Sequence, residues 1–156
     1  MPTPIPVQEK LYVPTTPPEV LRYETGTNLI SEQNLGGRGS IQISNGTSVD
    51  AVAKLVDNYS NKTIRLVYIR ASSVATVSSI RPGNYVLKFS LGTGYDSSSG
   101  KFTKAQSFSR FDEILGFYET RVGDSIRWKD FEVTLNAVVG GNASTSPISA
   151  SDFEDH

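Results

Sequence analysis

The segment IRPGNYVLKFSLGTGY, residues 80–95, decides the fold class. Pro82 and Gly83 form a turn, and from Tyr85 onward apolar and polar residues alternate until two glycines end the run. Leu87 and Phe89 share one face with Tyr85, because successive side chains of a strand point to opposite sides of a sheet. The segment therefore predicts a β-strand with one face in a core, and these five residues form its core signature.

Runs of the same kind recur through residues 37–141, which contain one proline. The clearest alternates apolar residues over 131–139, and it includes Val133 and Leu135. Further strands are expected at residues 41–44, 50–56, 63–70, 74–80 and 101–108. Helical spacing is confined to residues 111–118, where Gly116 interrupts it, so we expect one short turn of helix at most. The pattern predicts an all-β fold, a single antiparallel β-sandwich of about seven strands.

The two ends of the chain differ from this central part. Six of the eight prolines lie in the first 18 residues, which favours an extended chain over a helix or a central strand. We therefore assign residues 1–36 to a Pro-rich extended arm or linker, 37–141 to the sandwich domain, and 142–156 to a polar acidic tail. The arm and the tail are acidic and the domain has an excess of basic residues. This difference reflects chance or solubility, or it indicates that arm and tail dock on basic surfaces of their own or a neighbouring domain.

The arm contains a proline-free stretch, residues 20–30, that is rich in apolar residues. Sandwiches expose edge strands, and an extended chain can pair with such an edge through backbone hydrogen bonds. We predict that this interaction arm binds a neighbouring subunit through Val20, Leu21, Tyr23, Leu29 and Ile30. The alternative is an arm that folds back on its own sandwich or acts as a spacer.

The composition argues against catalysis. The chain of 156 residues has no cysteine, and its one histidine is the terminal His156. Thiol catalysis, a Ser-His-Asp triad, disulfides and most zinc sites are therefore excluded. The acidic pairs Asp112 with Glu113 and Asp130 with Glu132 are interpreted as diverging or solvent-facing residues. We predict that the protein is not an enzyme and has no metal and no cofactor.

Two other groups of residues were considered as binding sites. The loop at residues 92–101 has Asp96 but not the several carboxylates that calcium sites use, which favours a simple hairpin loop. Aromatic residues are candidates for a sugar- or peptide-binding face, although most aromatics of a small sandwich belong to its core; they are Tyr59, Tyr95, Tyr118 and Trp128.

A resemblance rests on the residues of the opening segment. The motif resembles the PG-x-Y-x-L signature of carboxypeptidase-regulatory-like, transthyretin-like β-sandwich modules, through Ile80, Pro82, Gly83, Tyr85, Leu87, Phe89, Gly94 and Tyr95. About two thirds of the chain is similar to a bacterial domain of that general type, which often follows an anchor or a low-complexity linker. The resemblance implies a seven-stranded sandwich used for binding, spacing or assembly, and it carries no catalytic residues over.

These observations lead to an expected function. We expect a non-enzymatic structural or interaction protein whose partner is a protein, with copies of itself as the leading choice and the arm contacting a neighbour. The alternative is a carbohydrate- or peptide-binding accessory module tethered by the Pro-rich segment. A net charge of −1 gives no reason to expect nucleic acid, and no apolar stretch is long enough for membrane insertion. An extracellular or cell-surface location is favoured if a signal or anchor precedes this sequence.

The first prediction concerns metals. We expect natively purified protein to contain no tightly bound transition metal, because the domain lacks thiol and imidazole ligands. Elemental analysis measures this, and stoichiometric zinc, copper or iron would contradict it.

Overall fold

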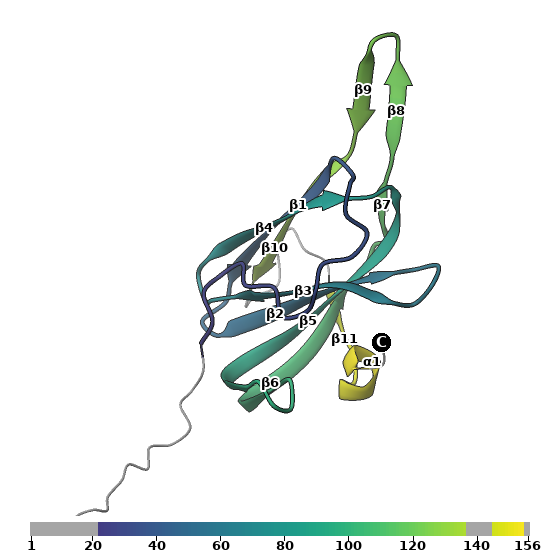
Figure 1. The fold of residues 1–156 in the computed structure, drawn as a ribbon. Coiled ribbons are helices and arrows are strands. Elements are labelled where there is room, and N and C mark those ends of the chain that lie inside the picture. Colours follow the sequence, from purple (N-terminus) through teal and green to yellow (C-terminus); the bar gives the residue numbers. More distant parts are fainter. Residues whose placement is uncertain (1–21, 137–144, 155–156) are drawn as a thin grey trace, which may run out of the picture.

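The computed structural model describes residues 22–136 and 145–154, which form an all-β sandwich (Figure 1). The elements in chain order are β1 (Gly39–Gly46), β2 (Asp50–Asp57), β3 (Thr63–Ile69), β4 (Val74–Ile80), β5 (Gly83–Asp96), β6 (Lys101–Phe111), β7 (Leu115–Phe117), β8 (Glu119–Val122), β9 (Ser125–Trp128), β10 (Asp130–Asn136), β11 (Thr145–Pro147) and α1 (Ala150–Glu154). The all-β prediction is confirmed, with eleven described strands in place of about seven. The additional strands have three or four residues, which is too short for alternation to identify them.

Two sheets make up the sandwich. The smaller has the order β10-β1-β4, and the larger has the order β11-β6-β5-β2-β3 with β7 paired to β5. All described pairs are antiparallel except β1 with β10, which run parallel. Alternation reports which face of a strand is buried and not its direction, so this pair could not be predicted from the pattern. Strands β8 and β9 form a separate hairpin that projects from the sandwich (Figure 1).

The main core lies between the two sheets. It includes Tyr85, Leu87 and Phe89 of β5, each at most 1% exposed, and it meets Val133 and Leu135 of β10. The predicted core face of β5 is confirmed. Strand β10 ends at Asn136, so the last residues of the run predicted over 131–139 lie outside the described residues.

The opposite face of the larger sheet is buried as well. Alternation places Val86, Lys88 and Ser90 of β5 on the face opposite the predicted core face, yet all three are buried. A second cluster, here called the outer cluster, covers this face. It consists of Val52, Tyr68, Tyr95, Phe102 and Phe153, with Tyr23, Leu29, Leu66, Phe108 and Ile148 packed against it. Residues 22–36 and 145–154 supply part of this cover, which makes the larger sheet the middle layer.

One part of the cover is the arm, residues 22–36, which lies along the edge of β3. Asn28 forms an antiparallel bridge with Val67. The main-chain N–H of Leu29 donates to the carbonyl oxygen of Leu66 at 2.7 Å. These bonds satisfy groups that an edge strand would leave unpaired. The arm therefore pairs with a sheet edge, as expected, but the edge belongs to its own domain.

The predicted interaction residues of the arm have different positions. Tyr23 and Leu29 pack against the outer cluster, and Ile30 is half-buried. Val20 and Leu21 lie outside the described residues. Residues 22–36 therefore adopt the alternative arrangement, an arm folded back on its own sandwich.

The other part of the cover comes from the segment predicted as a tail. Strand β11 pairs with β6, and α1 packs on the larger sheet. Lys54 donates to the carbonyl oxygen of Phe153, and Lys88 donates to that of Asp152 at 2.7 Å. The two lysines are register partners on β2 and β5, and their like charges repel each other. The carbonyl oxygens at the C-terminal end of α1 offset this repulsion. Residues 145–154 are thus a docked part of the domain and not a free tail.

No helix forms over residues 111–118. Phe111 ends β6, and Leu115 and Phe117 of β7 alternate into the main core on either side of Gly116. Ile114 and Tyr118 lie outside the strands and are exposed, so the apolar residues at helical spacing belong to two strands and to the surface. In the described part of the chain, no helix is long and apolar enough to cross a membrane.

The docked C-terminal segment generates the second prediction. Phe153 is 6% exposed and its ring lies 5.4 Å from that of Phe108. We expect Phe153→Ala to lower the free energy of unfolding by about 3 kcal/mol, because it removes a buried aromatic ring. Denaturant unfolding measures this, and Trp128→Ala, which removes an exposed ring, is the control. Equal midpoints for the two variants would show that the segment contributes no packing.

Candidate functional site

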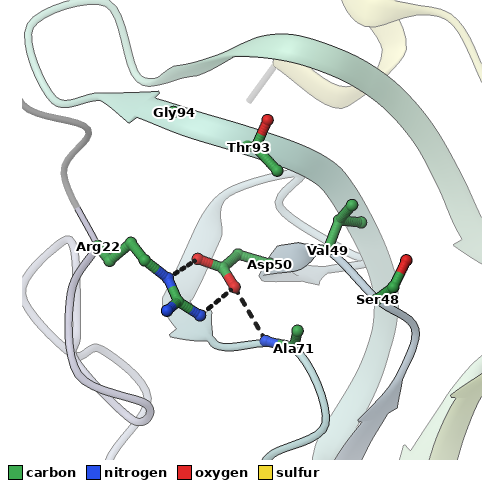
Figure 2. Close-up of a pocket in the computed structure, with 7 residues that line it drawn as sticks. All are labelled: Arg22, Ser48, Val49, Asp50, Ala71, Thr93 and Gly94. Atoms are coloured by element: carbon green, nitrogen blue, oxygen red, sulfur yellow. Dashed lines mark hydrogen bonds and ion pairs between the residues drawn. The ribbon is translucent and has the colours of Figure 1, made fainter.

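A surface hollow of about 370 Å³ lies where the arm meets the sandwich (Figure 2). Its walls come from the arm, the start of β2, the turn after β3 and the bulged part of β5. The lining residues are Arg22, Ser48, Val49, Asp50, Ala71, Thr93 and Gly94. The two charged groups of the hollow, Arg22 and Asp50, are in direct contact (Figure 2).

The buried carboxylate of Asp50 organises the hollow. Its oxygens accept hydrogen bonds from Nε and Nη2 of Arg22, both at 2.9 Å. They also accept from the Tyr68 hydroxyl at 2.6 Å and from the main-chain N–H of Ala71 at 2.9 Å. Burial by itself raises the pKa of Asp50, but these hydrogen bonds and the Arg22 charge outweigh it and hold that pKa below its ordinary value.

The pKa values of Arg22 and Tyr68, which donate to Asp50, are both raised. The hydrogen bond and charge of Asp50 raise the pKa of Arg22. Burial, together with the hydrogen bond to Asp50, raises the pKa of Tyr68, so its hydroxyl stays a donor at neutral pH. Because the carboxylate already accepts four hydrogen bonds, it has little capacity left to act as a base or a metal ligand. The arrangement suits a clamp that holds the arm.

A second polar anchor is Arg65 of β3, which is fully buried. Its Nε donates to the carbonyl oxygen of Gln33 at 3.0 Å, and its Nη1 donates to that of Ser78 at 2.8 Å. Its Nη2 donates to the carbonyl oxygens of Asn34 and Ser79, both at 3.3 Å. Burial lowers the pKa of Arg65. One side chain thus ties the arm and the edge strands of both sheets together.

The β8–β9 hairpin is the other distinctive surface. Tyr118, Val122 and Trp128 are 51%, 46% and 44% exposed. The two-residue turn has Gly123 at φ +61° in its first position, as in a type II′ turn. Among the described strands, the outer edges of β8 and β9 pair with nothing else. The hairpin therefore presents large apolar side chains that the described core does not use.

The base of the hairpin is fixed to the sandwich. The main-chain N–H of Arg38 donates to Glu119 at 2.8 Å, and Nη1 of Arg38 lies 3.1 Å from the other carboxylate oxygen. The ring of Phe131, next to the end of β9, packs on Phe117 with centroids 5.0 Å apart. These contacts set the direction of the hairpin while leaving its outer part exposed.

Most residues considered in the sequence have structural roles. Pro82 is exposed at the turn, and the Tyr85 hydroxyl donates to the carbonyl oxygen of Arg81 at 2.7 Å. Asp130 accepts from the N–H and hydroxyl of Ser40, both at 3.0 Å. Asp96 accepts hydrogen bonds within its own turn, as expected for a hairpin loop.

The aromatic candidates separate in space. Tyr95 is buried in the outer cluster, and Tyr59 is 98% exposed at the turn between β2 and β3. Tyr118 directly precedes β8 and Trp128 ends β9, so both lie at the base of the hairpin. The sequence reasoning missed this hairpin, although the Gly-Asp pair between ETRV and SIRW was the available signal. It also missed the ion pair of Arg22 with Asp50, whose spacing of 28 residues follows no local rule.

No group of three or more His, Asp or Glu residues that could hold a metal ion occurs within residues 22–136 and 145–154. Comparisons with family models, with curated proteins and with solved structures give no match. The geometry of the two surfaces described above is therefore the basis for a functional assignment.

The Asp50 clamp generates the third prediction. We expect Asp50→Asn to lower the free energy of unfolding at pH 7 by about 2 kcal/mol, because hydrogen bonds to a charged group are lost. Since the pKa of Asp50 is lowered in the folded protein, its stabilisation is full above the ordinary value of about 4 and disappears as the pH falls through the folded value. The difference between wild type and variant should therefore shrink in acid.

Denaturant unfolding between pH 7 and pH 2.5 measures this difference. Asp124→Asn, which changes an exposed carboxylate in the hairpin turn, is the matched control and should follow the wild type at every pH. A constant gap between wild type and Asp50→Asn down to pH 2.5 would contradict the clamp.

Proposed function

We propose that the protein is a non-enzymatic interaction module and that the β8–β9 hairpin is its contact surface. The observation that carries the proposal is the exposure of Tyr118, Val122 and Trp128 on a hairpin that projects from the sandwich (Figure 1). An isolated two-stranded hairpin is marginally stable in water, and exposed aromatic rings on it gain from a partner that covers them.

The chemistry of the hairpin favours a protein partner. Trp, Tyr and Arg are enriched at the centres of protein interfaces. By the strand register, Arg121 and Ile126 share the face that carries Trp128, whereas Val122 and Arg127 lie on the other. Both faces thus combine an apolar side chain with a guanidinium group. The hairpin can contact a partner from either side.

A second copy of the chain is the first partner to test. Within residues 22–136 and 145–154, the outer edges of β8 and β9 have no strand partner, and pairing of such edges between copies is a common route to self-association. A carbohydrate or a peptide is the alternative ligand, with either exposed aromatic ring as its contact. The hollow at Asp50 is the weaker candidate for a ligand, because its carboxylate is already engaged by the arm.

The fourth prediction uses the single tryptophan of the chain. Because Trp128 lies on the hairpin, its fluorescence reports on this surface alone. We expect its emission to shift to shorter wavelength as the protein concentration rises, with a parallel increase of mass above 17.0 kDa by light scattering. The variant Tyr118→Ala with Val122→Ala should unfold at the wild-type midpoint and lose both changes.

The control is Tyr59→Ala, which removes an exposed aromatic ring outside the hairpin and should behave as wild type. A constant emission and a monomeric mass at every concentration would exclude self-association through the hairpin. Titration with oligosaccharides and peptides, followed by the same fluorescence, then tests the alternative ligands. No change with any of these partners would refute the contact surface.

A further inference from the structure

We infer that the arm segment, residues 22–34, can be exchanged between two copies, so that it binds the same site on a neighbour. The site, here called the acceptor, comprises Asp50, the outer rings of Tyr68 and Tyr95, and the open edge of β3. This surface is distinct from the β8–β9 hairpin. The inference therefore stands or fails separately from the proposed function.

The contacts of the arm segment are continuous in sequence and lie outside the main core. Arg22 pairs with Asp50 at 2.9 Å, and the ring of Tyr23 lies 5.5 Å from that of Tyr68. Backbone bonds to β3 follow at Asn28 and its neighbours. No residue of the segment belongs to the core between the two sheets. It can leave the acceptor without opening that core.

An acceptor without an arm segment is destabilised, and the groups it leaves unpaired match one particular kind of segment. Without Arg22, the buried Asp50 carboxylate keeps only Tyr68 and Ala71 as donors, and a buried charge without its counterion is strongly destabilising. The edge of β3 also loses its hydrogen-bond partners. A chain that offers a guanidinium followed by Tyr and an extended stretch satisfies all of these groups. A second copy carries that same arm segment.

The connection between the arm segment and β1 has the properties of a hinge. Asn34 and Gly36 have φ of +55° and +100°, and Leu35 between them is 45% exposed. No atom lies within 4 Å of the position of a Cβ on Gly36, so a side chain at this position meets no steric obstacle. At Gly37 the chain already passes against the main chain of Ile80. A change of backbone at residues 35 and 36 would redirect the arm segment away from its own domain.

Reciprocal exchange produces a closed dimer with two-fold symmetry. Each acceptor then holds the neighbour's arm segment through the contacts seen within one chain. Because those contacts are the same in the monomer and in the exchanged dimer, the equilibrium between monomer and dimer depends on the conformation of the hinge and on protein concentration. Short hinges that are strained in the closed form favour exchange.

The experiment changes the hinge and measures mass. Valine is strained at φ +100°, so Gly36→Val disfavours the closed turn without a steric clash. We expect this variant to dimerise at a concentration roughly tenfold or more below that of wild type, by size exclusion with light scattering. Gly100→Val is the matched control, since Gly100 also has a positive φ and lies in the turn between β5 and β6, outside the hinge and the β8–β9 hairpin. It should keep the wild-type mass.

A second variant acts through length instead of backbone strain. Deletion of Leu35 and Gly36 prevents the turn from closing and should also give a dimer. Adding Arg22→Ala to Gly36→Val should weaken the dimer, whereas adding Trp128→Ala should leave it unchanged. A folded Gly36→Val protein that stays monomeric, or a dimer that is insensitive to Arg22→Ala, would overturn the exchange. If Gly36→Val does not fold, a monomeric deletion variant overturns it equally.

Discussion

The larger sheet must bury both of its faces, and the other features of the protein follow from this requirement. Strand β2 has no exposed residue between its first position and Val56, and its outer face carries Asp50 and Lys54 among apolar side chains. A buried face with such charges is stable only if hydrogen-bonding groups reach them. The arm brings a guanidinium to Asp50, and α1 brings carbonyl oxygens to Lys54 and Lys88. Residues 22–36 and 145–154 are therefore integral parts of the domain, although their sequences differ from it in composition.

This requirement also explains how far the sequence could be interpreted. Alternation over β5 and β10 correctly predicted an all-β sandwich and its main core, because apolar residues at a period of two have one stable placement. The same alternation indicated a solvent-facing outer side, since Lys88 and Ser90 are polar. Lys88 is buried against a helix whose Asp152 lies 64 residues further along the chain, and long-range hydrogen bonds leave no periodic trace in a sequence. The acidic character of the C-terminal segment and the basic character of the domain were the sole indications of docking.

The candidate site was predicted less well than the fold. Trp128 and Tyr118 were recognised as aromatic candidates, but the hairpin that holds them was not expected, because β8 and β9 have four residues each. The arm was expected to pair with a strand edge, and that physical argument was correct for residues 22–36. The arm can reach its own edge because the chain turns back at Asn34 and Gly36, and turn geometry at single residues is difficult to infer without a structure. Arg65, which fixes that turn, had no distinguishing neighbour in the sequence.

The parallel pairing of β1 with β10 has a consequence for how the chain folds. Ser40 is the register partner of Asp130, and the two residues are 90 positions apart. During synthesis from the N-terminus, β1 can pair with β4 long before β10 has emerged from the ribosome. One edge of the smaller sheet then remains open until most of the polypeptide has been made, with Ile41 and Ile43 covered from one side of their strand alone. Non-local pairing of this kind slows folding, so completion of the smaller sheet is a late event, and an unpaired strand edge is open to aggregation until then.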